Sequence, residues 1–394
     1  IAWDAVTDPF MGYLAERTSS KRGKYRPYIF FGTIPLALSF ILLFWVPPFT
    51  GISLFLCLLL INVFHRTCFT IVSVPYSSLT PRITSDSEER TKLTTARMIG
   101  ASFGTLLMSS LGFPIINYFG QNDESLGIFY LSSFAAFFAV FILYITYASV
   151  EESSTEVVKE IYPSISKLIL SILKNYPFWI VFSSILILGS TTIMFNKNLI
   201  YYIKYALDLH SYQGLVLGLS GLSSFASIPF WSYVSLKIGK RNTWQISMSL
   251  LLLAFALFYF YQINSLLELI IIVCLIGLAS GAGGVLFWSM LPDTIEYGEW
   301  KSGIRSESSL YGFMTFAQKS SIAVAALILG VLLTLINFSP NEVQSPETLR
   351  GLKNIMSIIP ASGIAISIFL MYFYPINSKY HKELLFNIEA KKNG

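Results

Sequence analysis

The chain has 394 residues, of which 54% are hydrophobic and only 12% are charged, and its formal net charge is +5. Soluble domains carry about 25% charged residues, so this composition excludes an ordinary soluble domain and predicts an all-α membrane protein. The basic residues fall in short loops, which argues against a nucleic-acid partner, and the three cysteines have no paired spacing that would indicate a disulfide framework or a zinc site.

Apolar runs of about 20 residues, long enough to cross a bilayer core of about 30 Å, recur along the whole chain. Charged stretches and stretches rich in Pro, Gly or Asn separate them. We expect eleven transmembrane helices, at 1–16, 27–47, 52–79, 92–118, 127–149, 177–205, 212–236, 243–262, 266–291, 308–336 and 352–375.

The charges of the predicted loops alternate between the two sides of the membrane. Basic residues collect at 17–26, around Arg82, near Lys240 and in the tail, whereas the intervening loops are poor in Lys and Arg. By the positive-inside rule the basic loops are cytoplasmic. No signal peptide is recognisable, and none is needed by the multi-pass protein of a bacterial inner membrane that we expect.

A long polar stretch separates two related halves of the sequence. "PFMGYLAERTSSKRGKYRP" in the first half and "PFWSYVSLKIGKRNTW" in the second share a Pro-Phe pair, an aromatic residue and a Gly-Lys/Arg turn. Repeated halves predict a transporter of six plus six helices. We therefore expect this chain to lack its first transmembrane helix; the alternative is a protein with eleven helices. The expected parts are an N-terminal bundle at 1–149, a cytoplasmic linker at 150–176, a C-terminal bundle at 177–375 and a cytoplasmic tail at 376–394.

Two acids in the first apolar span are candidates for a cation site, because ionisable residues inside a membrane are costly and usually functional. Asp4, Thr7 and Asp8 are spaced so that they share one helical face. Asp4 lies about 20 Å from the basic loop along its helix, and Thr70 of another helix lies at about 18 Å. Such oxygens suit Na⁺ or Li⁺, and paired carboxylates can equally hold a proton. A structural ion pair, for example between Asp8 and Lys319, is the alternative.

Candidate substrate and gate residues occur in other spans. Arg97 lies about 10 Å into its helix, where a guanidinium could bind substrate hydroxyls, bind a carboxylate, or form a gate salt bridge. Trp288 is one of several aromatics that could stack on a sugar or simply pack. It lies in the small-residue stretch 277–289, which allows close helix approach. A dinucleotide loop is excluded in this stretch because no strand precedes it.

The acids and basic residues at the cytoplasmic end of the tenth helix of a full transporter suggest an inner gate. Asp293, Glu296 and Arg305 could pair with Arg90 across the halves, and solvated loop charge is the alternative. The sequence has no Ser/His/Asp or HExxH arrangement, and the intramembrane His65 has no acidic or nucleophilic neighbour. The chain is therefore not expected to be an enzyme.

Three motifs resemble, in order and spacing, those of the glycoside–pentoside–hexuronide:cation symporter family, a branch of the major facilitator superfamily. They are "WDAVTDPFMGYLAERTSSKRGKYRPY", "VPYSSLTPRITSD" with the "ERTKL" and "AR" that follow it, and "DTIEYGEWKSGIRSESSLYGFMTFAQKSSIAV". The resemblance runs from Ile1 into the tail. It implies the two-halved fold of that superfamily, with no cofactor besides a coupling ion.

The resemblance also implies roles for single residues. A cation site matches Asp4, Thr7, Asp8 and Thr70, so that Na⁺ could bind at Asp4, Asp8 and Thr70. The sugar-binding Asp of the melibiose permease falls at Ser73 and its nearby Trp at Ser77, which leaves specificity for α-galactosides open. We expect substrate contacts at Ser73, Ser77, Arg97, Lys319 and Trp288, and an inner gate at Arg90, Asp293, Glu296 and Arg305.

We therefore expect a monomeric transporter that carries a sugar or glycoside together with Na⁺, Li⁺ or H⁺ by alternating access, with the sugar beside the cation between the halves. One alternative is a non-sugar substrate, such as a lysolipid or a small organic anion. A non-transporting membrane receptor or scaffold is the more distant alternative, and it predicts no gradient-driven flux.

Overall fold

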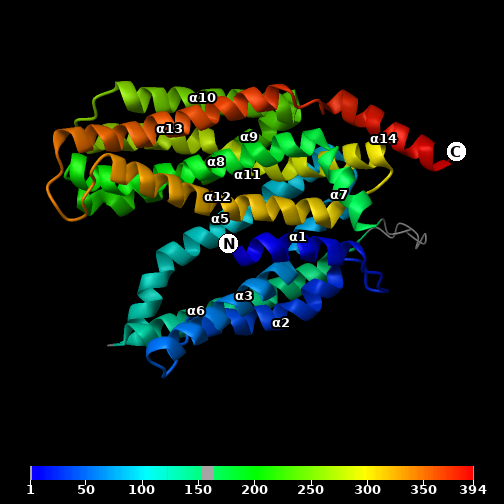
Figure 1. The fold of residues 1–394 in the computed structure, drawn as a ribbon, viewed down its shortest axis with the longest axis horizontal. Coiled ribbons are helices and arrows are strands. Elements are labelled where there is room, and N and C mark those ends of the chain that lie inside the picture. The colour runs from blue at the N-terminus through cyan, green and yellow to red at the C-terminus, as the bar shows by residue number, and fades with distance from the viewer. Residues whose placement is uncertain (1, 122, 153–163, 394) are drawn as a thin grey trace. The chain divides into compact units, whose positions relative to one another are not determined.

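The computed structural model of the protein describes residues 2–121, 123–152 and 164–393, and the chain in these ranges is helical (Figure 1). Ten of its helical segments are long and apolar enough to cross a membrane. They contain α2 (Arg26–Leu43), α3 (Gly51–Ser78), α5 (Ser87–Gly120), α6 (Glu124–Ser149), α8 (Tyr176–Tyr201), α9 (Gln213–Ile238), α10 (Lys240–Phe260), α11 (Leu266–Ser302), α12 (Glu307–Leu335) and α13 (Pro346–Tyr372). The all-α membrane fold predicted from composition is therefore confirmed.

Shorter elements complete the chain. The predicted first helix is α1 (Ala2–Glu16), and α4 (Thr80–Ile83) continues α3 after a single residue. A π-helical turn at Tyr202–Ala206 extends α8, and a 3₁₀ turn at His210–Tyr212 precedes α9. Of the linker expected at 150–176, residues 153–163 lie outside the described residues. Two helices in polar regions were not predicted: α7 (Ile165–Leu173) and α14 (Ser378–Asn393).

The chain forms two compact units, and two helices are divided between them. The first unit consists of Ile1–Asp86, Gly100–Ile169 and Ser306–Phe316, and the second of Ser87–Ile99, Leu170–Arg305 and Ala317–Gly394. The first turns of α5 thus belong to the second unit, and the first turns of α12 belong to the first unit. Charged residues hold both of these helix starts, as described below.

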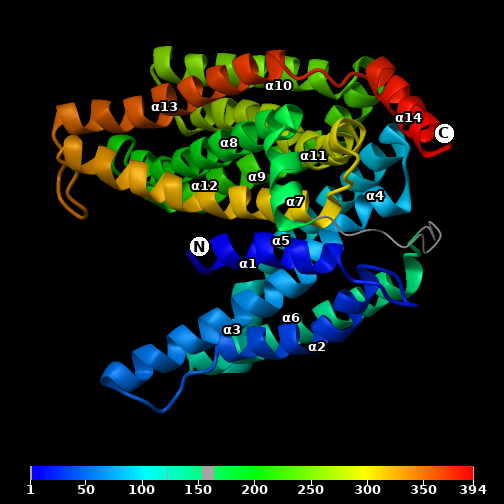
Figure 2. The same cartoon turned by 45° about the vertical axis from the view of Figure 1, so that its right-hand side comes forward.

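In the first unit, α2 packs between α3 and α6, and the three helices lie side by side in both views (Figures 1 and 2). Gly32 of α2 faces Val72 of α3, where an added side chain would collide with the valine. Buried apolar residues, among them Met11 of α1 and Val74 of α3, form a core that fixes α1 against α3. This packing positions the predicted cation-site acids.

In the second unit, α9 packs on α11 and α10 packs on α13, as both views show (Figures 1 and 2). Gly277 and Gly281 of α11 face the α9 backbone, where an added Cβ would meet the carbonyl groups of Ser220 and Ser224. Close helix approach at the small-residue stretch of α11, as its sequence predicts, is confirmed.

The predicted end of one helix was wrong. The helix predicted at 266–291 was expected to end near residue 291 because charged residues follow. In the structure this helix is α11, which continues to Ser302 with Pro292 inside it. Asp293 and Glu296 are buried in this extension and paired with basic groups. The pairing satisfies the carboxylates, so the helix need not end where the charges begin.

Candidate functional site

The first candidate site lies where α1 meets α3 in the first unit. Asp4 and Asp8 are both fully buried, one helical turn apart. Asp8 Oδ1 accepts a 2.6 Å hydrogen bond from Thr70 Oγ1 of α3. Asp4 Oδ2 lies 2.7 Å from Arg66 Nη1, also on α3. The structure thus brings three of the four predicted cation-site residues together, beside an arginine that the sequence analysis had missed.

The α3 side of this site is a polar stripe on a mostly apolar helix. Arg66, Thr70, Ser73 and Ser77 follow one another at spacings of four, three and four residues, which puts them on one helical face. The Ser73 hydroxyl is buried and makes no hydrogen bond within the part of the chain that the structure describes. The stripe therefore offers oxygen atoms and one guanidinium to the α1 acids.

Thr7, the fourth predicted cation-site residue, makes a hydrogen bond within its own helix. Its hydroxyl donates a 3.1 Å hydrogen bond to the Trp3 carbonyl of its own helix. Trp3 in turn donates from Nε1 to Thr67 Oγ1 of α3 at 2.9 Å. This end of α1 is therefore fastened to α3 next to the acids.

The electrostatics of the site follow from these contacts. A buried carboxylate is costly unless a partner compensates its charge. The formal charges of Asp4, Asp8 and Arg66 sum to −1. The rule that points to Asp4 and Asp8, an ionisable residue within an apolar span, applies equally to Arg66 and could have found it.

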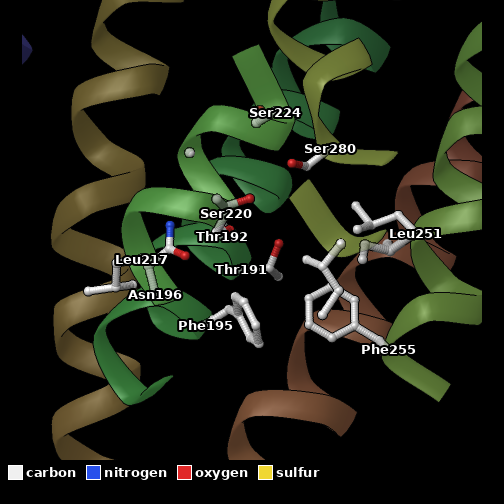
Figure 3. Close-up of a pocket in the computed structure, with 13 residues that line it drawn as sticks. Thr191, Thr192, Phe195, Asn196, Leu217, Ser220, Ser224, Leu251, Phe255 and Ser280 are labelled. Carbon is white, nitrogen blue, oxygen red and sulfur yellow. The ribbon is translucent and has the colours of Figure 1, made fainter. Parts of the chain in front are cut away.

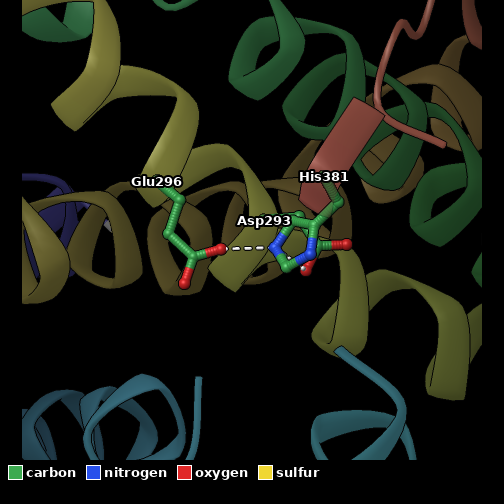
Figure 4. Close-up of side chains that lie close together, drawn as sticks. All are labelled: Asp293, Glu296 and His381. Atoms are coloured by element: carbon green, nitrogen blue, oxygen red, sulfur yellow. Dashed lines mark hydrogen bonds and ion pairs between the residues drawn. The ribbon is translucent and has the colours of Figure 1, made fainter. Parts of the chain in front are cut away.

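The second candidate site is a buried charge network around α11 in the second unit. Arg90 of α5 donates from Nη2 to Glu296 Oε1 at 2.6 Å, and its Nη1 lies 3.7 Å from Asp293 Oδ1. Lys240, the first residue of α10, lies 2.7 Å from Asp293 Oδ2. His381 of α14 contacts Glu296 Oε2 through Nε2 at 2.5 Å (Figure 4). The structure thus brings together three of the four predicted gate residues.

Arg305, the fourth predicted gate residue, pairs locally, with its Nη1 2.7 Å from Glu299 Oε2. Lys240 and His381 were missed because they enter the network from distant parts of the sequence. Lys240 lies in a Gly-Lys-Arg turn, whose sequence cannot be distinguished from that of an ordinary basic loop. His381 lies in a tail that was not expected to form a packed helix.

Asp293, Glu296 and His381 are residue types that bind metals, and one ligand atom from each lies within 4.8 Å of the others (Figure 4). Basic side chains already contact both carboxylates: Lys240 contacts Asp293, and Arg90 contacts both acids. A divalent ion would have to displace these contacts against the repulsion of two cationic groups. The residues present therefore fit an ion-pair network better than a metal centre.

The surroundings of His381 shift its ionisation. Burial alone lowers the pKa of the imidazole, but the hydrogen bond to Glu296 and the negative charges of Asp293 and Glu296 oppose that effect. Lys240 acts in the same direction as burial. The net result is that the pKa of His381 lies above its usual value, which favours the imidazolium ion beside Glu296.

A similar network in the first unit holds the start of α12. Glu307 Oε2 accepts hydrogen bonds from Arg82 Nε at 2.6 Å and from the Tyr25 hydroxyl at 3.0 Å. Glu16 pairs with Lys24 at 3.0 Å and accepts from the backbone N–H of Ser308 at 2.9 Å. The first turns of α12 are thus tied by charge to the unit that contains α1, as the first turns of α5 are tied to α11.

The predicted substrate residues divide between the two units. Arg97 lies over the Trp288 ring, with its guanidinium carbon 5.4 Å from the ring centroid, and both residues belong to the second unit. Lys319 of α12 also belongs to the second unit and is half-buried. Ser73 and Ser77 lie on the polar stripe of the first unit. Within the second unit, a cation and an aromatic face are therefore brought together.

Curated relatives match nearly the whole chain. A glucuronide carrier protein homolog of Escherichia coli (strain K12) is 27% identical over 99% of this chain and 85% of its own length. An isoprimeverose transporter of Lactiplantibacillus pentosus is 27% identical over 98% of this chain and 81% of its own length. Among solved structures, the E. coli fucose:proton symporter has a TM-score of 0.68 at 13% identity, covering 94% of this chain and 88% of that one.

At 13% identity the structural likeness shows the fold alone, and that fold is the major facilitator fold expected from the motifs. The family model described as MFS/sugar transport protein matches residues 1–378. The predicted resemblance and the exclusion of an enzyme are both confirmed by these matches. The chain therefore belongs to the MFS/sugar transport protein family and is a multi-pass membrane transporter.

Proposed function

We propose that the protein moves a sugar or glycoside across a bacterial cytoplasmic membrane together with Na⁺, Li⁺ or H⁺, by alternating access. The observation that carries this proposal is the buried pair Asp4 and Asp8, with Thr70 bonded to Asp8 and Arg66 bonded to Asp4. Further support comes from two relatives, a glucuronide carrier protein homolog and an isoprimeverose transporter.

The proposed cation site is formed by Asp4, Asp8 and Thr70, with Thr7 at its edge. Oxygen ligands suit a hard cation such as Na⁺, and a cation bound there would add positive charge beside the two buried carboxylates. Arg66 acts as a tethered competitor that holds Asp4 when the cation is absent. Coupling then follows from linkage, because a cation that tightens substrate binding must itself bind more tightly, by the same factor, when substrate is present.

The proposed substrate contacts are Arg97, Trp288, Lys319, Ser73 and Ser77. An arginine fork binds adjacent hydroxyls or a carboxylate, and an indole face stacks on the apolar face of a sugar ring. A small organic anion is the second candidate substrate. The cationic groups of Arg97 and Lys319, together with the glucuronide relative, favour it.

We propose that Arg90, Asp293 and Glu296 act as an inner gate, and that Arg305 supports the gate through Glu299. Opening such a gate separates buried charges, which is unfavourable unless ligand binding compensates. The gate would therefore stay closed until ligand binding offsets the cost of separating these charges.

Uptake by the protein reconstituted in liposomes tests the function. A panel of labelled glycosides, pentosides and hexuronides is offered with an inward Na⁺ gradient, with an inward proton gradient, and with neither. Accumulation of one sugar under one gradient identifies both the substrate and the coupling ion. No accumulation of any sugar under either gradient refutes sugar symport.

The Asp8→Asn variant tests the cation site. This change removes one buried carboxylate charge while keeping the size of the side chain, so we expect Na⁺-stimulated uptake to be abolished. The matched control is Asp208→Asn, which removes an exposed carboxylate from a loop. Unchanged Na⁺ stimulation in Asp8→Asn would overturn the assigned site.

A further inference from the structure

A cavity of about 370 Å³ lies within the second unit, apart from every residue assigned above (Figure 3). Helices α8, α9, α10, α11 and α13 contribute to its walls. Five hydroxyl groups and one amide line it, from Thr191, Thr192, Asn196, Ser220, Ser224 and Ser280. Ligand pockets in proteins commonly measure about 300–1,000 Å³, so the cavity is large enough for a small molecule.

The hydroxyls of the cavity are arranged for hydrogen bonding. Thr191 donates to the Leu188 carbonyl at 3.0 Å, and Ser280 donates to the Gly277 carbonyl at 2.9 Å. Because each of these hydroxyls has used its only proton, its oxygen remains available to accept a bond from a ligand. Figure 3 shows the hydroxyls of Thr191, Ser220 and Ser280 pointing toward a common space.

Other polar groups of the cavity can still donate. The side chains of Asn196, Ser220 and Ser224 make no hydrogen bond to the protein within the described residues. A hydroxyl can donate one bond and accept two, and an amide offers two donors and one carbonyl oxygen. The cavity therefore presents donors and acceptors together, which is the complement of a group rich in hydroxyls.

The other residues that line the cavity determine which class of ligand it can bind. Phe195 and Phe255 lie edge to face, with ring centroids 5.1 Å apart, and form an apolar side of the cavity (Figure 3). No side chain that lines the described cavity is ionisable. A carboxylate or sulfonate would be desolvated there without a compensating cation, which is strongly unfavourable. A neutral ring with hydroxyls on its edge and an apolar face fits both kinds of wall.

We propose that this cavity binds a neutral glycosyl ring of the transported molecule, as a subsite distinct from Arg97 and Trp288. The inference rests on the proposed function, because it deepens the assignment of the substrate. The subsite binds the neutral ring of a glycoside and excludes the carboxylate of a hexuronide. A space filled only by water is the alternative that the experiment must exclude.

Gly221 of α9 offers a place to alter the wall of the cavity without a clash at Cβ. It lines the cavity, and an added Cβ there would meet no atom within 4 Å. A leucine at this position therefore adds bulk at the wall of the cavity, and its Cβ meets no neighbouring atom. Gly218, three residues earlier on the same helix, also has open space around an added Cβ but does not line the cavity. Gly218→Leu is the matched control.

Uptake of a labelled neutral glycoside should show at least a tenfold higher half-saturating concentration for Gly221→Leu, with Gly218→Leu close to the parent protein. Both variants are first compared with the parent by thermal unfolding in detergent. Equal half-saturating concentrations in Gly221→Leu and the parent overturn the subsite while leaving the transport function intact. If the parent itself accumulates no sugar under either gradient, the proposed function fails instead.

A labelling experiment tests binding without relying on transport. Ser220→Cys places a thiol in the cavity, and its alkylation by N-ethylmaleimide is measured against the background of the native Cys57, Cys68 and Cys274. We expect the neutral glycoside to slow alkylation several-fold and a hexuronide to leave it unchanged. Absence of protection by the neutral glycoside overturns the proposal, even where Gly221→Leu impairs uptake, because the cavity would then hold water alone.

Discussion

Removal of the Arg90 guanidinium should be the most damaging single change in the charge network of the second unit. Arg90 and Glu296 are almost completely buried, at 0% and 1% side-chain exposure, and their closest N–O distance is 2.6 Å. In Arg90→Gln, Glu296 keeps its contact with His381, and Asp293 keeps its ion pair with Lys240. The network nevertheless loses one positive charge, and that charge lies between the two carboxylates.

The size of the effect follows from burial. Breaking a buried pair by removing one partner costs about 3–5 kcal/mol, because the other charge stays desolvated. Each carboxylate in Arg90→Gln retains one basic neighbour, so we expect the lower end, about 3 kcal/mol of unfolding free energy. The exposed Lys237→Gln on α9 is the control and should change that free energy by less than about 0.5 kcal/mol.

Titration of the micelle-solubilised protein with sodium dodecyl sulfate measures the unfolding free energy. The double variant Arg90→Gln with Glu296→Gln removes both charges, so it should lose less than the sum of the two single variants. We expect a coupling free energy of about 0.5–3 kcal/mol, the range for residues that share one network. Additive losses would show that the two side chains contribute independently, and the reasoning about the network would then be wrong.

Two further predictions concern single basic groups. Because the pKa of His381 is raised, its stabilising contribution is complete below the ordinary His value of about 6.5 and is lost as pH rises through the raised value. At pH 6 the melting temperature of the parent should therefore be higher than that of His381→Gln. This difference in melting temperature should shrink as the pH rises toward 9. A difference that does not change with pH would contradict the prediction. Arg66→Gln should lower the half-saturating Na⁺ concentration for uptake about fivefold, because it removes a charged group that competes with Na⁺ for Asp4. The effect is modest because the Arg66 side chain is 39% exposed, so solvent weakens its attraction to Asp4. A raised half-saturating concentration would instead make Arg66 a supporting residue of the site.

The acids of α1 could be predicted because their signal is local. Asp4 and Asp8 are one helical turn apart in an apolar span, and the length of chain to the basic loop gives their depth. The partner helix could be predicted only through the resemblance, which pointed to Thr70. Arg66 carries the same local signal but belongs to no quoted motif. Its contact with Asp4 depends on how α1 rotates against α3, which a sequence pattern does not specify.

The charge networks were predictable only in part, because their partners are far apart in the chain. Arg90 and Glu296 are separated by 206 residues, and His381 reaches Glu296 only because the polar tail folds into α14. Arg305 shows the opposite case, since its partner Glu299 is six residues away and competes locally for the guanidinium. Spacing along a helix specifies local pairs well, whereas contacts between elements depend on the packing of several helices at once.

The two networks also explain why two long helices are divided between the units. α5 and α12 occupy equivalent places, since each is followed by one more transmembrane helix before its half of the sequence ends. In both, a charged group at the start of the helix pairs with a residue of the unit to which that start belongs: Arg90 pairs with Glu296, and Glu307 pairs with Arg82. Detaching either start would leave a charge buried without its partner, at a cost of about 3–5 kcal/mol. A ligand can offset that cost only by its difference in affinity between two states, so the proposed cation and sugar would have to contribute together.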